Sequence, residues 1–430
     1  MKNSLRILVV ILCFLLAWFR PALSEARVYL DITSAQLRKV PVAVPYFEES
    51  SKVGTVSETG KKMSELLGRA LAFHGFIEIM APEKYMKVPE ADWKTLGLDF
   101  SIMGKYTQTA SGMVMELRLY DVREGRMILG RRYRGVRDKW RVMVLKFCDE
   151  VVMKLTGEPG VSLSRIAFVS EASGFKEIYV SDVLGDEIRQ VTSHGSLALS
   201  PRFSPDGSQL VYTSYHRGNP NLYITDLSQS KVTRPLSKRQ GLNMAPAWSP
   251  DGKKMAVTLS VDGNPDLYLM DMKGNIVERL TKEAGINVSP SWSPDGRQLV
   301  FISDRTGAPQ LYLMELGNRA VRRLTYQGSY NTSPSWSPKG DLIAYTGRYE
   351  GNYHIFTISP DGKQLKRLTN SWGDYESPSW SPDGRQVVFS RYRSDKKQIC
   401  SVFENGAGVR ALFHFSGNQT LPQWSPRLEM

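Results

Sequence analysis

Cysteine is scarce in this chain. Three cysteines occur among 430 residues, and one of them, Cys13, lies in an apolar run at the N-terminus. The other two, Cys148 and Cys400, are far apart in the sequence, and we assign them to different domains. A disulfide framework therefore does not hold this protein together, and a chain of this length stabilises itself by burying apolar cores.

Motifs that mark several enzyme classes are missing as well. The five histidines do not pair at metal-ligand spacing, and no His-Glu-x-x-His motif occurs. The chain also lacks a Gly-x-Ser-x-Gly nucleophile elbow and a phosphate-binding glycine-rich loop after a strand. We therefore predict no catalytic residue, no metal and no cofactor, and we keep a hydrolase or lyase as the alternative.

Long apolar runs are absent except at the N-terminus. There, Lys2 and Arg6 precede the 13 apolar residues 7–19, and small residues follow at 22–24. At about 1.5 Å per residue this run is shorter than a hydrocarbon core of roughly 30 Å, so we predict a secretory signal cleaved after Ser24 and no membrane span in the mature chain. Cleavage removes three basic residues and no acidic one, which lowers the net charge from +13 to +10. An exported protein is not expected to bind nucleic acid.

A repeat with a period of 44 residues fills the C-terminal part. The segment Pro-x-Trp-Ser-Pro-Asp-Gly begins at Pro246, Pro290 and Pro378, with variants at 201–207 and 334–340 and a truncated copy from Pro422. The aromatic positions of successive copies are 45, 44, 44, 44 and 44 residues apart. Each unit shows four short alternating strands bounded by turn residues, which is typical of a β-propeller blade.

The two ends of the repeat region complete each other. A strand at 165–170 has no Pro-x-Trp segment before it, whereas the last copy has nothing after its first strand. We therefore predict six blades, in a ring closed by pairing of the C-terminal strand with the first blade. The recurrent Trp is expected to fill the space between blades, and the recurrent Asp to form the turn.

The N-terminal part shows no such period. Strands alternate there with helices, which favours a small α/β domain. We predict strands at 40–47, 76–80, 100–107, 114–122 and 127–133, and helices at 62–73, 91–96 and 138–155. The predicted organisation is a signal peptide at 1–24, a flexible tail at 25–39, an α/β domain at 40–160 and an all-β six-bladed propeller at 161–430.

The two faces of the propeller differ in their loops. Tight turns join the first strand to the second and the third to the fourth, and longer loops, such as 215–220, 348–352 and 392–397, lie on the other face. The linker at 157–160 enters a second strand, so we expect the N-terminal domain to contact the tight-turn face and leave the long-loop face for a partner. Polar and aromatic residues should ring the channel mouth there, and they either bind a peptide loop or cap strand ends. These residues are Asn243, Asn287, Asn331, Tyr375 and Gln419.

A basic run is the densest positive patch of the chain. It is opposed only by Asp138, and it is either a solvated face or a surface that attracts anionic envelope components. Its members are Arg126, Arg131, Arg132, Arg134, Arg137, Lys139 and Arg141.

The repeats resemble the WD40-like propeller repeats that also occur in tricorn-type and prolyl-oligopeptidase-type peptidases. The whole mature chain resembles, more specifically, the TolB family of the Tol–Pal system. The segments that carry this resemblance are Arg27-Val-Tyr-Leu-Asp-Ile32, Val42-Ala-Val-Pro-Tyr-Phe47, Leu96-Gly-Leu-Asp99, Leu155-Thr-Gly157, Arg165-Ile-Ala-Phe168 and the terminal Pro-x-Trp-Ser-Pro.

The resemblance implies a non-enzymatic adaptor of the periplasm that supports outer-membrane integrity and constriction during cell division. It implies binding of the peptidoglycan-associated lipoprotein at the propeller mouth and of TolA through the N-terminal tail, with other outer-membrane or peptidoglycan-linked proteins as further partners. The resemblance puts the family's mouth residues around 242–245 and 288–289. Together with the ring of residues ahead of the inner strands, the predicted mouth residues are Asn243, Met244, Ala245, Asn287, Val288, Ser289, Asn331, Thr332, Tyr375, Glu376 and Gln419. The implied tail residues are Arg27, Tyr29 and Asp31.

Overall fold

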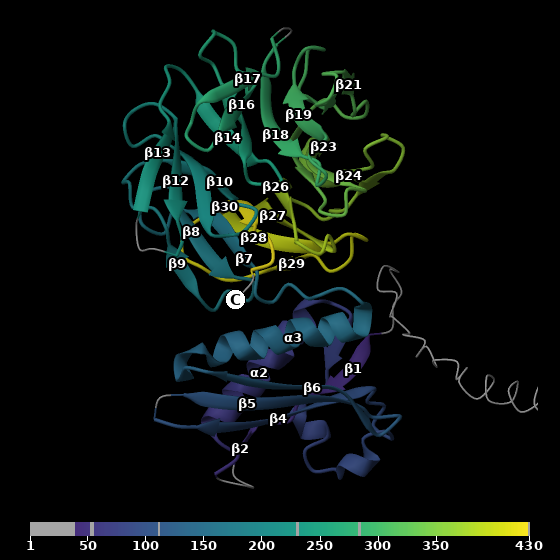
Figure 1. Ribbon diagram of the computed structural model, residues 1–430. Coiled ribbons are helices and arrows are strands. Elements are labelled where there is room, and N and C mark those ends of the chain that lie inside the picture. Colours follow the sequence, from purple (N-terminus) through teal and green to yellow (C-terminus); the bar gives the residue numbers. More distant parts are fainter. Residues whose placement is uncertain (1–38, 52–55, 111, 229–231, 283–284, 429–430) are drawn as a thin grey trace, which may run out of the picture. The chain divides into compact units, whose positions relative to one another are not determined.

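The computed structural model describes residues 39–51, 56–110, 112–228, 232–282 and 285–428 (Figure 1). The predicted signal peptide and the tail residues Arg27, Tyr29 and Asp31 lie outside these ranges. No helix in the described part of the chain has both the length and the apolar character that crossing a bilayer requires.

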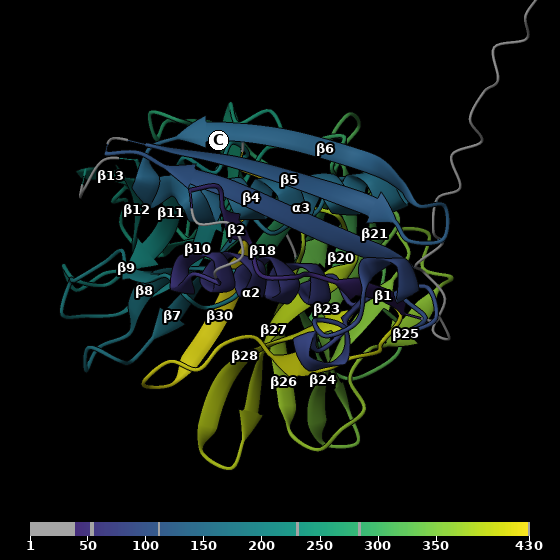
Figure 2. The same ribbon diagram turned by 90° about the horizontal axis from the view of Figure 1, so that it is seen from below.

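The N-terminal part contains one mixed sheet, which confirms the predicted α/β fold. Its strands are β1 (Val40–Ala43), β2 (Glu48–Glu49), β3 (Ile77–Ile79), β4 (Phe100–Gln108), β5 (Met113–Asp121) and β6 (Arg126–Gly135). They run in the order β3-β1-β4-β5-β6, with β2 paired to β4. β1 is parallel to β3 and β4, whereas β4, β5 and β6 are antiparallel. Figure 2 shows the three long strands side by side, with β6 at the edge of the sheet.

Helix α2 (Glu58–Phe73) begins four residues earlier than predicted. The prediction missed the first turn because its residues are polar and show no helical spacing of apolar side chains. Ser57 caps this turn by accepting a hydrogen bond from the Gly60 amide at 2.9 Å. Glycine is needed at this position because a Cβ there would lie 2.0 Å from the carbonyl oxygen of Phe47.

Helix α3 (Trp140–Thr156) follows the short 3-10 turn η3 (Arg137–Lys139) and ends at Gly157, whose φ is 82°. The helix predicted at 91–96 is wrong. Only the 3-10 turn η2 (Glu90–Asp92) forms there, after a similar turn η1 (Pro82–Lys84), and Gly97 at φ 75° reverses the chain. The reversal leaves Trp93 packed against Tyr85, with ring centroids 5.5 Å apart.

The C-terminal part forms six four-stranded antiparallel sheets, which confirms the six-bladed propeller. The ring closes as predicted, because β30 (Gln419–Trp424) pairs with β7 (Arg165–Ser170), followed by β8 (Glu177–Asp182) and β9 (Ile188–Gln190). The next two blades are β10 (Ala198–Phe203), β11 (Gln209–Ser214), β12 (Asn221–Asp226), β13 (Val232–Ser237), and β14 (Asn243–Trp248), β15 (Lys254–Leu259), β16 (Asp266–Asp271), β17 (Ile276–Arg279). The remaining three are β18 (Asn287–Trp292), β19 (Gln298–Ser303), β20 (Gln310–Glu315), β21 (Val321–Arg323); β22 (Asn331–Trp336), β23 (Ile343–Tyr349), β24 (Asn352–Ile358), β25 (Leu365–Arg367); and β26 (Asp374–Trp380), β27 (Gln386–Arg393), β28 (Lys396–Phe403), β29 (Arg410–Ala411).

Tryptophan fills the space between blades, as predicted. The indole Nε1 of Trp292 donates to the carbonyl oxygen of Ala247 in the preceding blade at 3.0 Å, and Trp380 donates likewise to Ser335 at 3.0 Å. The Asp of the repeat forms the turn, as also predicted. Asp251 accepts from Ser249 Oγ at 2.6 Å and from the Lys253 amide at 3.0 Å.

Every inner strand contains a bulge at the residue before its proline. A non-glycine residue adopts a positive φ at each of these six places. The residues are Ser200, Ala245, Ser289, Ser333, Ser377 and Leu421, with φ of 53°, 48°, 55°, 52°, 58° and 51°. The bulge separates the mouth end of each inner strand from the Pro-x-Trp end.

Two loops predicted on the long-loop face are instead extended hairpins. Strands β27 and β28 continue to Arg393 and Lys396, and the turn between them is formed by Ser394 and Asp395 at φ of 46° and 60°. Two successive positive φ values match the twist of a tight hairpin turn. Strands β23 and β24 likewise extend to Tyr349 and Asn352.

Candidate binding site at the propeller mouth

The five residues predicted to ring the mouth begin their inner strands or lie next to the start, and their side chains are buried. The exposed fractions are 0% for Asn243 and Asn287, 2% for Asn331, 1% for Tyr375 and 2% for Gln419. The structure therefore places these side chains inside the loops of the mouth, away from solvent.

Asn243 shows what such a side chain does. Its Oδ1 accepts from Ser237 Oγ at 2.6 Å and from the Arg239 amide at 3.1 Å. Its Nδ2 donates to the carbonyl oxygen of Arg239 at 2.7 Å. The amide group closes the loop that leads into β14, which favours the capping role of this ring.

The next two blades use a shared arrangement. Asn287 Nδ2 donates to Asp266 Oδ1 at 2.9 Å, and the same oxygen accepts from Thr281 Oγ1 at 2.6 Å. Asn331 donates to the equivalent Gln310 Oε1 at 2.8 Å. Each asparagine therefore fastens its loop to the third strand of the preceding blade.

Tyr375 and Gln419 hold their loops through main-chain carbonyls. The Tyr375 hydroxyl donates to Trp372 at 3.4 Å, and Gln419 Nε2 donates to Phe415 at 2.6 Å. These contacts complete a ring of five loop-fastening side chains, which fixes the positions of the neighbouring inner-strand residues.

The remaining predicted mouth residues are partly exposed and are available to a partner. They are Met244, Ala245, Val288, Ser289, Thr332 and Glu376. Glu376 is the single ionisable member of this set, and its pKa is raised by burial and by the nearby charge of Asp374. The inner strands pair on one side only, so their other backbone edge adds donors and acceptors along the channel.

Exposed aromatic residues near the mouth were missed by sequence reasoning. Tyr326 and Trp372, in loops that lead into inner strands, are 74% and 63% exposed. Arg323 lies 5.0 Å from the Tyr326 ring centroid, and Arg393 lies 5.8 Å from that of Trp372. Aromatic and arginine side chains are enriched among residues that dominate protein interfaces. A search for aromatic residues just ahead of the inner strands would have found both.

Two histidines also meet near the mouth. The rings of His194 and His216 have centroids 4.5 Å apart, and each Nδ1 lies within 3.1 Å of Ser214 Oγ. Burial lowers the pKa of both rings, and neighbouring positive charge lowers it further. Among the described residues, no three His, Cys, Asp or Glu side chains come together in a way that would hold a metal ion.

The basic run is largely engaged within the protein. Arg126 pairs with Glu124 and Arg131 with Glu150. Arg132 lies 3.4 Å from Glu116, which supports the solvated-face alternative for these strand residues. Most of the side chains in these pairs are well exposed, so the pairs add little to stability.

Arg141 behaves differently from the rest of the run. Its Nη2 lies 3.0 Å from Asp182 and 2.8 Å from Asp186, at the turn between β8 and β9. Arg69 of α2 also donates to Asp186, at 2.9 and 2.6 Å. This turn joins a third strand to a fourth, so both contacts lie on the tight-turn side where the N-terminal domain was expected to bind.

Both parts of the chain match known protein families. The family described as "TolB beta propeller domain" matches residues 152–428, and "TolB amino-terminal domain" matches residues 28–128. The crystal structure of TolB from Acinetobacter baumannii is similar, with a TM-score of 0.80 and 28% identity over 93% of this chain and 99% of that one.

Several curated relatives carry the name "Tol-Pal system protein TolB", and two of them illustrate the similarity. The protein from Desulfotalea psychrophila is 44% identical over 51% of this chain and 50% of its own length. The protein from Desulfosudis oleivorans is 38% identical over 54% of each chain. The chain therefore spans about half the length of the curated relatives it matches.

Proposed function

This chain belongs to the TolB family, and from that premise we propose that it acts in a Tol-Pal system as a periplasmic adaptor. It binds the peptidoglycan-associated lipoprotein at the propeller mouth and TolA through the N-terminal tail that contains Arg27, Tyr29 and Asp31. By these contacts it supports outer-membrane integrity and constriction during cell division. The proposal contains no catalytic step.

One observation carries the mouth assignment. Partly exposed residues of successive inner strands, such as Met244, Val288 and Thr332, stand directly beside buried caps that fix their loops. A binding surface whose loops are already ordered loses little conformational entropy when a partner docks. The arrangement suits recognition of a folded protein domain better than turnover of a small substrate.

Calorimetry with the soluble domain of the lipoprotein tests the proposal. Thr332→Arg introduces a long charged side chain at the mouth and should weaken binding at least tenfold. Gln364→Arg is the matched control, because Gln364 is exposed in the turn between β24 and β25 of the same blade and should leave affinity unchanged. Equal loss in both variants, or no binding by the unaltered protein, would contradict the proposal. A stoichiometric metal in the purified protein would instead favour the hydrolase or lyase alternative.

A further inference from the structure

The central channel of the propeller contains a cavity of about 560 Å³. All six inner strands line it, from the bulge residues to the Ser-Pro turns. It therefore occupies the half of the channel nearer the tight turns, and the capping residues of the mouth are not part of its lining.

One position in this lining breaks the repeat. The residue between Pro and the aromatic is small in four blades, namely Ala247, Ser291, Ser335 and Ser379, and is Gln423 in a fifth. In the remaining blade it is Arg202. All six residues line the cavity, so this ring of positions carries one guanidinium among neutral side chains.

The charge of Arg202 has no acidic counterpart there. The described residues that line the cavity include no Asp or Glu. Arg202 Nη1 donates to the carbonyl oxygen of Pro201 at 2.8 Å, and no carboxylate pairs with it among the described ion pairs. Burial lowers the pKa of the Arg202 guanidinium to about 10, so the group remains charged at neutral pH.

The other cation of the lining is already engaged. Arg427 donates through Nε to the carbonyl oxygen of Gly160 at 3.2 Å and through Nη2 to that of Pro159 at 2.9 Å. Its charge still adds to the positive potential of the cavity, because neutral carbonyl groups do not cancel it. The lining therefore carries two positive charges and no negative one.

Serine hydroxyls of the same ring offer donors. Ser291 Oγ accepts from the backbone amide of Trp336 at 3.1 Å, and Ser379 Oγ accepts from that of Trp424 at 3.0 Å. A hydroxyl that accepts one hydrogen bond still has its own proton to donate. Charged and neutral donors around a cavity are what an oxyanion requires.

We propose that this cavity binds a compact oxyanion of the size of phosphate, with Arg202 as the charged partner and channel serines as further donors. A free anion is favoured over a carboxylate of a docked protein, because Arg202 lies four residues beyond Ala198 at the mouth end of β10. At about 3.3 Å per residue, Arg202 is roughly 13 Å along the strand from the mouth, which is farther than a carboxylate side chain of a protein docked at the mouth reaches. The proposal is independent of the adaptor function.

Equilibrium dialysis of the mature protein with radiolabelled inorganic phosphate, at constant ionic strength set with sodium chloride, tests this site. The unaltered protein should retain one phosphate per chain in a saturable manner. Arg202→Ser installs the residue that three other blades carry, and it should weaken retention at least tenfold. Arg217→Ser is the matched control, because it removes one exposed charge from the same blade and should retain phosphate normally.

Circular dichroism establishes that each variant is folded. If Arg202→Ser does not fold, Arg202→Lys replaces it, and it should keep the stoichiometry with weaker affinity. Absence of saturable retention by the unaltered protein, or equal retention by a folded Arg202→Ser variant, would overturn the proposal.

Discussion

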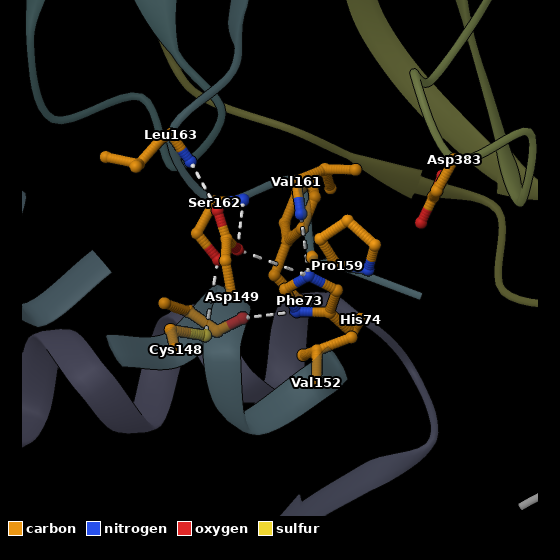
Figure 3. Close-up of polar contacts among 12 residues, drawn as sticks. Phe73, His74, Cys148, Asp149, Val152, Pro159, Val161, Ser162, Leu163 and Asp383 are labelled. Carbon is orange, nitrogen blue, oxygen red and sulfur yellow. Dashed lines mark hydrogen bonds and ion pairs between the residues drawn. The ribbon is translucent and has the colours of Figure 1, made fainter. Parts of the chain in front are cut away.

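The backbone amide of Val161 donates a hydrogen bond to His74 Nε2 over 3.2 Å, and Nδ1 of the same ring lies 2.9 Å from the carbonyl oxygen of Ala70 (Figure 3). A ring that accepts at Nε2 carries its proton on Nδ1, so His74 is neutral. Asp149 lies beside it and accepts from the amides of Ser162 and Leu163 at 2.8 and 3.3 Å. One side chain from the end of α2 and one from α3 therefore fix the segment that leads into the propeller.

The neutral His74 predicts a pH dependence of stability. Its pKa is lowered from the ordinary 6.5 by burial, although the charge of Asp149 opposes the shift. In the window between the lowered value and 6.5 the unfolded chain binds more protons than the folded one, so the free energy of unfolding should fall as the pH falls. One such proton gives a slope of at most about 1.4 kcal/mol per pH unit.

Urea denaturation between pH 7.5 and 5.5 measures this slope. The His74→Gln variant should show a smaller slope than the unaltered protein, because it lacks the imidazole that binds a proton when the chain unfolds. Parallel curves for the two proteins would rule out His74 as the titrating group.

Loss of a mouth cap should cost stability. Asn243→Ala leaves the Arg239 amide and the Arg239 carbonyl without their partner, which costs about 1–3 kcal/mol for buried groups. Thr332→Ala, at a partly exposed mouth residue of another blade, should change the free energy of unfolding by less than about 0.5 kcal/mol. Chemical denaturation compares them, and an unaffected Asn243→Ala variant would show that the cap is dispensable.

Substitutions of the bulge residue in an inner strand should change stability to different extents. Ser289 has a φ of 55°, which glycine adopts freely and β-branched residues resist. Ser289→Val should lose about 1–3 kcal/mol, whereas Ser289→Gly should be near neutral, since relief of strain offsets its greater unfolded-state entropy. Met244→Val, on a strand residue without a positive φ, is the control for adding a β-branched side chain. Thermal unfolding of the three variants gives the comparison, and equal effects of Val and Gly at 289 would refute it.

Closure of the ring should depend on Trp424. This side chain is 2% exposed, its Nε1 donates to Ser164 Oγ at 2.8 Å, and its ring lies 6.1 Å from that of Phe73. Trp424→Ala should lose about 3–5 kcal/mol, as expected for a buried Trp. The exposed Trp372 is the matched control, and its replacement by Ala should cost less than about 0.5 kcal/mol. Similar midpoints in urea for the two variants would contradict a closing role.

The periodic parts of the fold were predictable because each blade repeats the same chemistry. Six copies of one pattern locate every inner strand and show which strand closes the ring. Local features without a repeat were harder. The first turn of α2 is polar and depends on the Ser57 cap, and the predicted helix at 91–96 gave way to a turn that packs Trp93 on Tyr85.

The position of the candidate site could be predicted from the sequence, whereas the roles of its residues could be predicted only in part. The spacing placed Asn287 at the mouth, but its buried capping role depends on Asp266, which stands 21 residues earlier and belongs to the preceding blade. Arg202 could be seen in the sequence as an exception to the repeat. Only the three-dimensional arrangement shows that Arg202 lines a cavity whose lining has no carboxylate.

Site-specific photo-crosslinking in living cells tests the adaptor account most directly. A photoreactive amino acid replaces Thr332 at the mouth or Gln364 at the tight-turn end of the same blade, and adducts are identified by mass spectrometry. The account predicts an adduct with the peptidoglycan-associated lipoprotein from position 332 and none from position 364. A lipoprotein adduct from position 364 alone, or from neither position, would contradict it.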